Sequence, residues 1–225
     1  MDTVKVLDFH SHTFFSDGEL CPSELAQRAR MKGYRVLGIT DHADASNLGP
    51  CVEAALGAAR GLSDAYGDFA VIPGVELTHV PPKKLPALIA EARRLGAKLV
   101  VVHGETPVEP VEKGTNRAAI EGNCDILAHP GLLTEEDATL AREEGVFLEL
   151  SARGGHSLAN GRVAALATRA GAKLLVNSDA HAPGDLLTPG FQETVTLCAG
   201  LSAARHREIM EDASRLALKL LGGLP

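Results

Sequence analysis

Seven short apolar runs at nearly regular intervals constrain the fold of this chain more than any other feature. The runs are aliphatic and β-branched without polar alternation, as is typical of parallel strands covered on both faces. They span residues 4–9, 36–40, 69–77, 99–102, 126–128, 146–150 and 174–176. The intervening segments show helical spacing, beginning at Pro22 with Glu24 and ending near Gly33, then at 85–95, 135–144 and 162–170, the last three followed by glycine. The pattern therefore predicts a repeated βα unit.

Polar residues at the ends of the runs make the period countable. His12, His42, Glu76, His103, His129, Ser151 and Asp179 follow one another at separations of 30, 34, 27, 26, 22 and 28 residues. One βα unit needs about 30 residues. Right-handed crossovers build either a doubly wound sheet or a barrel from such units, and periodicity alone leaves both open. After Asp179 we expect only two helices, at 185–199 and 202–221, and no eighth strand.

The size of the chain fits one hydrophobic core. With 225 residues, 45% of them hydrophobic, we expect a single domain over residues 1–225. No apolar stretch reaches the length of about 18 residues that crosses a bilayer, and no signal-peptide pattern precedes the first run, so we expect a cytoplasmic location without membrane contact. The four cysteines form no CxxC pair, which argues against a zinc knuckle or a redox motif.

Charge and aromatic content argue against a nucleic-acid partner. The formal net charge is −7, and the chain has only six Phe, two Tyr and no Trp. Proteins that bind strands of nucleic acid instead present basic grooves and aromatic stacking surfaces.

Histidines and carboxylates follow the apolar runs one after another. Because the carboxyl ends of parallel strands share one face of the fold, these side chains are expected to converge there. The His10-x-His12 and Asp179-x-His181 spacings place both members of each pair on the same side of an extended segment. The collected N and O donors, with no cysteine among them, suit Zn, Mn or Fe, and their number calls for several metal ions.

The motifs in this order resemble those of the polymerase and histidinol phosphatase (PHP) superfamily of metal-dependent phosphoesterases. The resemblance rests on HSH at 10–12, SDG at 16–18, ITDH at 39–42, GVE at 74–76, VVH at 101–103, AHPG at 128–131 and NSDAH at 177–181. It implies a distorted seven-stranded, TIM-like (β/α) barrel of the α/β class, in agreement with the seven runs.

The resemblance also implies a trinuclear site of nine ligands. The first metal would take His10, His12, Glu76 and Asp179; the second Glu76 as a bridge, with His103 and His129; and the third Asp17, His42 and His181. The family varies at the position of Asp17. Of these ligands, Asp17, His42, Glu76, Asp179 and His181 are also the candidate catalytic groups. Asp8 and Asp41 resemble groups that orient neighbouring histidines.

Other polar residues receive weaker assignments. Arg153 is the basic group best placed to bind a substrate phosphate, and Arg117 is a second candidate for that role. We interpret His79 as a loop or packing residue and His206 as a solvated helical residue. His156 is an even choice between site and surface, and Glu105 receives no role.

The leading functional hypothesis is hydrolysis of a small phosphate monoester, with a hydroxide bridging metal ions as the nucleophile and up to three divalent ions (Zn, Mn or Fe) as cofactors. The family resemblance suggests histidinol phosphate first, although no residue specifies it. The alternatives are a phosphodiesterase or nuclease of the PHP type and a non-catalytic scaffold like the RNase P subunits that resemble PHP barrels. Amidohydrolase barrels also begin with HxH, but they expect a lysine where this chain has His103. The oligomeric state is left open.

Overall fold

The chain forms a nearly closed barrel of parallel strands surrounded by helices. A computed structural model describes residues 5–63 and 65–222. Within them, the strands are β1 (Val6–Asp8), β2 (Tyr34–Ile39), β3 (His42–Ala43), β4 (Ala70–Leu77), β5 (Leu99–His103), β6 (Ile126–Ala128), β7 (Phe147–Ser151) and β8 (Leu174–Asn177). The helices are α1 (Pro22–Met31), α2 (Leu48–Ser63), α3 (Leu85–Leu95), α4 (Thr115–Glu121), α5 (Glu135–Glu144), α6 (Asn160–Ala170), α7 (Pro189–Cys198) and α8 (Ala203–Leu221), with 3-10 turns at Pro82–Lys84 and His156–Ala159.

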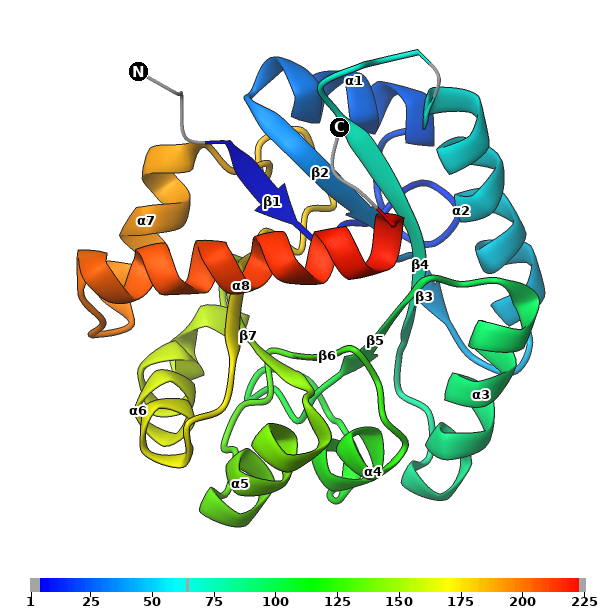
Figure 1. Cartoon of the computed structure of the whole chain (residues 1–225). Helices are drawn as coiled ribbons and strands as arrows, with labels where there is room; N and C mark the ends of the chain where they lie inside the picture. The colour runs from blue at the N-terminus through cyan, green and yellow to red at the C-terminus, as the bar shows by residue number, and fades with distance from the viewer. Residues whose placement is uncertain (1–4, 64, 223–225) are drawn as a thin grey trace.

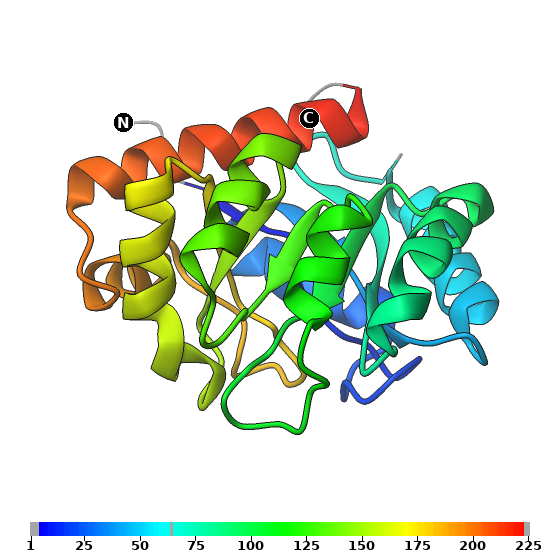
Figure 2. The same ribbon diagram turned by 90° about the horizontal axis from the view of Figure 1, so that it is seen from below.

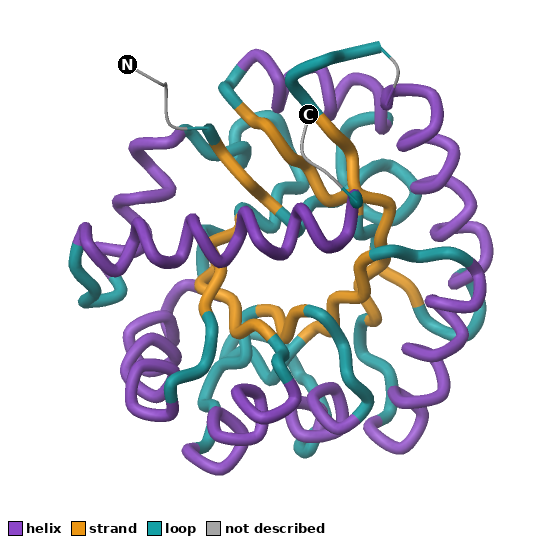
Figure 3. Tube along the Cα trace, viewed as in Figure 1, coloured by secondary structure: helices purple, strands orange, loops and turns teal. Residues whose placement is uncertain are grey.

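The strand order settles the choice between an open sheet and a barrel. Strands pair in parallel in the order β1-β2-β4-β5-β6-β7-β8, with β3 beside β4. A bridge between Ser11 and Ala180 joins the segments that follow β1 and β8. Figures 1 and 3 show the strands as an inner ring with helices outside. The predicted barrel is confirmed. Each of the seven predicted runs overlaps one strand, with boundaries that differ by at most two residues; Val4, in the first run, lies outside the described residues.

Several helix boundaries differ from the sequence predictions for local reasons. The helix expected at 185–199 begins only at Pro189, because the hydroxyl of Thr188 accepts the backbone N–H of Phe191 and caps the helix there. The helix expected at 162–170 begins two residues earlier, at Asn160. Helices α2 and α4 and the two-residue strand β3 were not predicted. Helices α3, α5 and α6 end as expected at glycines in the left-handed conformation.

The two ends of the barrel differ in what fills them. Ala213, Leu216 and Ala217 of α8 pack with side chains from the barrel interior, such as Leu7 and Leu99. Figures 1 and 2 show α8 lying across one end of the barrel, opposite the loops that follow the strands. Because α8 closes the amino-terminal end of the strands with apolar contacts, the polar chemistry is confined to the carboxyl end.

The inward alternation of the strands carries polar side chains to that carboxyl end. Leu99 and Val101 of β5 face the barrel interior, and the next residue with the same orientation is His103. The same step of two leads from Phe147 to Glu149 on β7. On β5 and β7, the inward-facing side chains therefore change from apolar to polar within the last three residues of the strand.

Candidate metal centre

Eight of the nine histidines of the chain gather at the carboxyl end of the barrel. Their rings form a connected set in which neighbouring centroids lie 4.1–6.3 Å apart. The members are His10, His12, His42, His79, His103, His129, His156 and His181. This crowding brings all the predicted histidine ligands together and adds two histidines that were not assigned as ligands.

Glu76 lies at the centre of this set. Its side chain is fully buried, and its carboxylate oxygens lie 3.3 Å from His10 Nε2, 2.6 Å from His42 Nδ1 and 3.6 Å from His129 Nε2. Asp179 lies beside it, 3.3 Å from His12 Nε2. The two carboxylates therefore connect the histidines of the three predicted metal positions.

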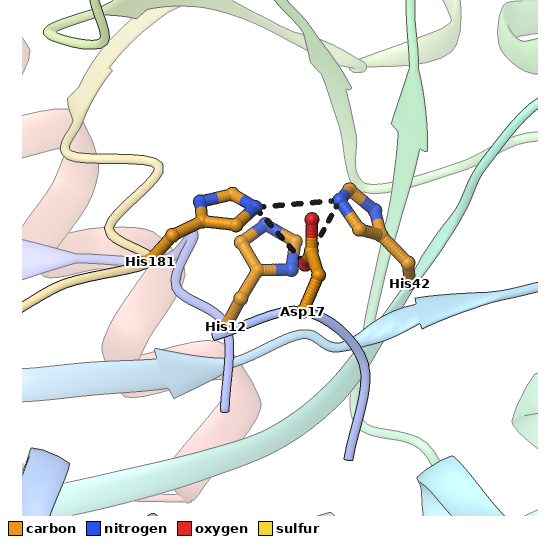
Figure 4. Close-up of side chains that lie close together, drawn as sticks. All are labelled: His12, Asp17, His42 and His181. Carbon is orange, nitrogen blue, oxygen red and sulfur yellow. Dashed lines mark hydrogen bonds and ion pairs between the residues drawn. The ribbon is translucent and has the colours of Figure 1, made fainter. Parts of the chain in front are cut away.

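The third predicted metal position is formed by two strand ends and one loop. Asp17 Oδ1 lies 3.1 Å from His181 Nε2 and 3.5 Å from His42 Nε2, and the two Nε2 atoms are 3.4 Å apart. Figure 4 shows these side chains converging, with the ring of His12 behind them. Ligands at about 2.0–2.2 Å from a single ion are separated from one another by roughly 3–3.5 Å, so the spacing fits a cation between them.

Hydrogen bonds fix the tautomers of two histidines in the form that metal binding needs. Glu149 Oε2 accepts from His10 Nδ1 at 2.8 Å, and the carbonyl of Gly104 accepts from His103 Nδ1 at 3.2 Å. With the proton on Nδ1, each Nε2 presents a lone pair toward a carboxylate. A lone pair facing a carboxylate is repulsive unless a cation or a proton lies between them.

Unsatisfied buried atoms in the described residues lead to the same conclusion. His10 Nε2, both ring nitrogens of His12, Glu76 Oε1 and His129 Nδ1 are buried without a hydrogen-bond partner, and elsewhere only Arg205 Nε is in this condition. Native proteins rarely leave such groups unpaired unless an ion or water completes them. The residues therefore fit bound metal ions.

The electrostatics of the site call for positive charge. Although burial opposes ionisation, the surrounding histidines hold the pKa values of Glu76 and Asp179 below their usual range. Burial also disfavours a charged His10, but the carboxylates of Glu149, Glu76 and Asp179 outweigh it and raise the pKa of the ring. Burial lowers the pKa of His12 to about 3, so this ring stays neutral and able to act as a ligand.

Two of the ligands adopt strained backbone conformations. His129 has φ of 28° and Asp179 has φ of 53°, a region that non-glycine residues rarely occupy. Each such residue costs of order 1–3 kcal/mol and persists where the surroundings enforce it. The strained backbone therefore lies at two predicted metal ligands, whose side chains it directs into the site.

The residues predicted to orient histidines, Asp8 and Asp41, accept hydrogen bonds from backbone and hydroxyl groups rather than from histidine rings. Asp8 accepts from the backbone N–H groups of His10 and Ser178, and burial raises its pKa to about 6. Asp41 holds the loop before Asp17 by accepting from the backbone and hydroxyl of Thr13. The group that contacts the ring of His10 is Glu149, which we did not predict. A lone acidic residue in the otherwise apolar run 146–150 was the signal for it.

The two candidate phosphate ligands lie in different places. Arg153 lines a cavity of about 50 Å³ together with six of the predicted ligands, and its Nη1 lies 2.7 Å from His181 Nδ1. Arg117 is on α4, where its guanidinium pairs with Glu121 and Asp137. The structure thus brings Arg153 to the site and does not bring Arg117 there.

The remaining assignments are resolved as follows. His206 is 6% exposed and bonds to Thr196, so its interpretation as solvated was wrong. His156 is buried in the site, with its ring stacked on His129. His79 is an exposed loop residue that bonds to Glu109, a site carboxylate missed by the sequence analysis. Glu105 accepts from the backbone of Gly114 and Asn116 and so ties the two ends of one loop.

Among the helices that the structure describes, none combines the length and apolar character needed to cross a lipid bilayer.

Comparisons with known proteins place these observations in a family. The uncharacterized protein MJ1295 of Methanocaldococcus jannaschii is 50% identical over 196 residues, covering 87% of this chain and 90% of that protein. Ribonuclease P protein component 3 of Methanosarcina barkeri is 30% identical over 159 residues, 68% of this chain and 59% of that protein. A structure of the metal-dependent tyrosine phosphatases YwqE of Bacillus subtilis and CpsB of Streptococcus pneumoniae shares the fold, with a TM-score of 0.60, 19% identity and 94% coverage of both chains.

A family comparison agrees with the motifs and the geometry. The family model of the PHP domain matches residues 8–153, which include seven of the nine predicted ligands, and Asp179 and His181 join those seven in space. The chain therefore belongs to the PHP domain family.

Proposed function

We propose that this protein is a metal-dependent phosphoesterase that hydrolyses a small phosphate monoester. The observation that carries the proposal is the convergence of six histidines on the buried carboxylates of Glu76 and Asp179, with five donor atoms left unpaired. The nine ligands would hold up to three divalent ions, and Zn, Mn and Fe all suit the donor set. Histidinol phosphate stays a candidate substrate from the resemblance alone.

Bound metal ions would supply positive charge to the phosphate oxygens and activate water for in-line attack. The protein residues have separate tasks. Glu149 holds the ring of His10 through Nδ1, and Asp41 holds the loop that carries Asp17. Arg153, with its guanidinium at the edge of the cavity, is placed to contact the phosphate by charge-assisted hydrogen bonds.

Charge balance favours a monoester over a diester. Three divalent ions (+6) and Arg153 (+1) against the carboxylates of Asp17, Glu76, Glu109 and Asp179 (−4) and a hydroxide nucleophile (−1) leave about +2 at the site, which matches a phosphate dianion. A diester brings only one negative charge and a second substituent that needs room. The cavity of about 50 Å³ is small, so the leaving group would have to extend toward solvent.

A non-catalytic role is the second candidate, favoured by the similarity to ribonuclease P protein component 3. A scaffold does not require nine ligands aimed at common points, and the net charge of −7 does not favour RNA. Both arguments favour the phosphoesterase over the non-catalytic scaffold.

The test compares 4-nitrophenyl phosphate with its bis ester after loading the protein with Mn, Zn or Fe. We expect higher kcat/KM for the monoester and loss of turnover in Asp179→Asn. Asp68→Asn makes the same chemical change at an exposed carboxylate that pairs with Arg30, and it should retain activity. Faster cleavage of the bis ester would favour the phosphodiesterase, and no turnover with any metal would favour the scaffold.

A further inference from the structure

Glu109 is a carboxylate that lies within the histidine cluster but belongs to none of the three predicted metal positions. Its Oε2 lies 3.0 Å from His103 Nε2 and 3.2 Å from His79 Nε2, and its Oε1 lies 3.5 Å from His156 Nε2. Three ring nitrogens thus surround one carboxylate. The separations are close to the 3.1 and 3.5 Å between Asp17 and its two histidines at the third metal position.

His156 approaches the same place from the other side. Its side chain is 5% exposed, and nitrogens of His103, His129 and His156 lie within 4.8 Å of one another. Nδ1 of His156 lies 2.7 Å from Thr106 Oγ1, a hydroxyl that can accept a proton from Nδ1 or donate one to it. In the tautomer with the proton on Nδ1, the Nε2 lone pair faces Glu109 and Asp179, as it does in His10 and His103.

The loop that carries Glu109 is anchored at both ends. Glu105 Oε1 accepts from the backbone N–H groups of Gly114 and Asn116, and the side chain of Asn116 donates to the carbonyl of Pro130. Figure 2 shows this loop, between β5 and α4, at the end of the barrel opposite α8. Because its ends are tied, the loop can hold a ligand without a large entropic loss on binding.

Val108 holds the loop against the segment that carries His156. A Cβ at Gly155 would lie 3.3 Å from Val108 Cγ2, so the two segments of the chain are in close contact immediately before His156. Glu109 and His156 therefore approach the site as one packed unit.

We propose that Glu109 and His156 are additional ligands of the second metal position, beside Glu76, His103 and His129. His79 acts as a positioning residue, because its Nε2 contacts Glu109 from the exposed side of the loop, where its own side chain is 43% exposed. A position with five protein donors exceeds the four of tetrahedral zinc sites and suits Mn or Fe in higher coordination. The inference rests on the metal centre of the proposed function, and its test measures metal binding rather than turnover.

The test is metal analysis of Glu109→Gln, His156→Gln and the wild type after reconstitution with Mn²⁺, combined with Mn²⁺ affinities from chelator competition. Glu109→Gln keeps the shape and removes the charge, and we expect at least a tenfold loss of affinity for one ion. His156→Gln should weaken the binding of the same ion. The variant with both substitutions should not weaken the binding of a second ion. The preference of that position should also move from Mn toward Zn in Glu109→Gln.

Glu112→Gln is the matched control, since it makes the same change on an exposed residue of the same loop. It should bind Mn²⁺ like the wild type. Thermal melts of the metal-free variants separate folding defects from ligand loss. Unchanged affinities in both Glu109→Gln and His156→Gln would overturn the inference. Unchanged metal binding with an altered affinity for inorganic phosphate, measured by titration of the metal-loaded protein, would also overturn it, by assigning Glu109 to the substrate. Neither result depends on whether the enzyme turns over a monoester.

Discussion

At the scale of single residues, the contact between Arg153 and His181 stands out from the other histidine contacts. A guanidinium only donates hydrogen bonds, so His181 Nδ1, 2.7 Å from Arg153 Nη1, must accept. The ring proton is then on Nε2, which faces Asp17 and cannot bind a metal ion. In the other tautomer Nδ1 donates to the carbonyl of Asp179 at 3.0 Å, and Arg153 has to leave. Binding of the third metal and this Arg153 contact exclude each other.

Because the two contacts exclude each other, removing Arg153 should strengthen metal binding and weaken substrate binding. Arg153→Ala should bind the third metal ion more tightly, by several-fold, because nothing competes for His181 Nδ1. The same variant should have a raised KM for a monoester, because the phosphate loses a cationic partner. Metal titration and steady-state kinetics measure the two effects. Arg169→Ala, which removes an exposed arginine on α6, serves as the control for lost charge. Weaker metal binding in Arg153→Ala would contradict the exclusion.

His206 offers a residue-scale test of stability outside the site. Burial lowers its pKa from the ordinary value of 6.5, so the unfolded chain binds more protons than the folded one as pH falls below about 6.5. The stabilisation by the neutral ring is complete above that pH and decreases below it. We expect His206→Gln to be less stable by about 1 kcal/mol at pH 8, with the difference shrinking toward pH 5. Urea unfolding at both pH values tests this, and a difference that grows at pH 5 would be inconsistent with a buried neutral ring.

The sequence predicted the ligands better than the groups around them. Ligands such as Glu76 and His103 lie in the last two residues of their strands, where position in the strand alone determines which face they reach. Glu109 lies in the loop after β5, whose course depends on the hydrogen bonds of Glu105 and Asn116, and His156 begins a 3-10 turn, so a position in a strand determines neither side chain. Arg117 and His206 were misjudged because the faces of α4 and α8 that carry them depend on their packing.

At the scale of elements, the loop after β1 shows how close packing aims a ligand. Gly18 follows Asp17 and lies against the strand end, where a Cβ would come 2.5 Å from the carbonyl oxygen of His12. The backbone N–H of Gly18 also donates to the carbonyl of Thr13 at 2.9 Å, which closes the turn. Only glycine permits this approach, so the SDG motif reflects geometry as well as chemistry.

Gly18→Ala should therefore displace Asp17 without removing it. We expect at least a tenfold loss of affinity for the third metal ion and a stability loss of about 1–3 kcal/mol, as for other overpacked sites. Isothermal titration with Mn²⁺ and urea unfolding of the metal-free protein measure the two quantities. Gly49→Ala on α2, where a Cβ meets nothing within 4 Å, is the control. Full occupancy of all ions in Gly18→Ala would show that Asp17 needs no such placement.

At the scale of the whole molecule, the barrel separates stability from chemistry. One end is closed by α8 through apolar contacts, and the other gathers acids and histidines. The period of the apolar runs predicted this architecture because each strand is defined locally. The helices α2 and α4 escaped prediction because one is rich in alanine and glycine and the other is a single short segment between loops. The barrel closes between β1 and β8, where hydrogen bonds join segments about 170 residues apart in the sequence. No local sequence pattern predicts such a contact.

Metal removal should lower the stability of the folded protein, because many carboxylates and unpaired ring nitrogens lie together at the carboxyl end of the barrel. Ligand binding at 100 times Kd stabilises the folded state by about 2.7 kcal/mol per site, which in a chain of this length corresponds to roughly 5–10 °C in Tm. Scanning calorimetry should therefore show a lower Tm after chelation and recovery on adding Mn²⁺. Because ligand histidines must be neutral and the carboxylates raise the pKa of His10 above its ordinary value of 6.5, protons compete with Mn²⁺ already above that pH, and the gain should shrink further as pH falls below it. Asp179→Asn, which lacks one shared carboxylate, should gain less from Mn²⁺ than the wild type. Equal melting of the chelated and loaded proteins would mean that the unpaired atoms of His10, His12 and Glu76 are satisfied by water rather than by metal.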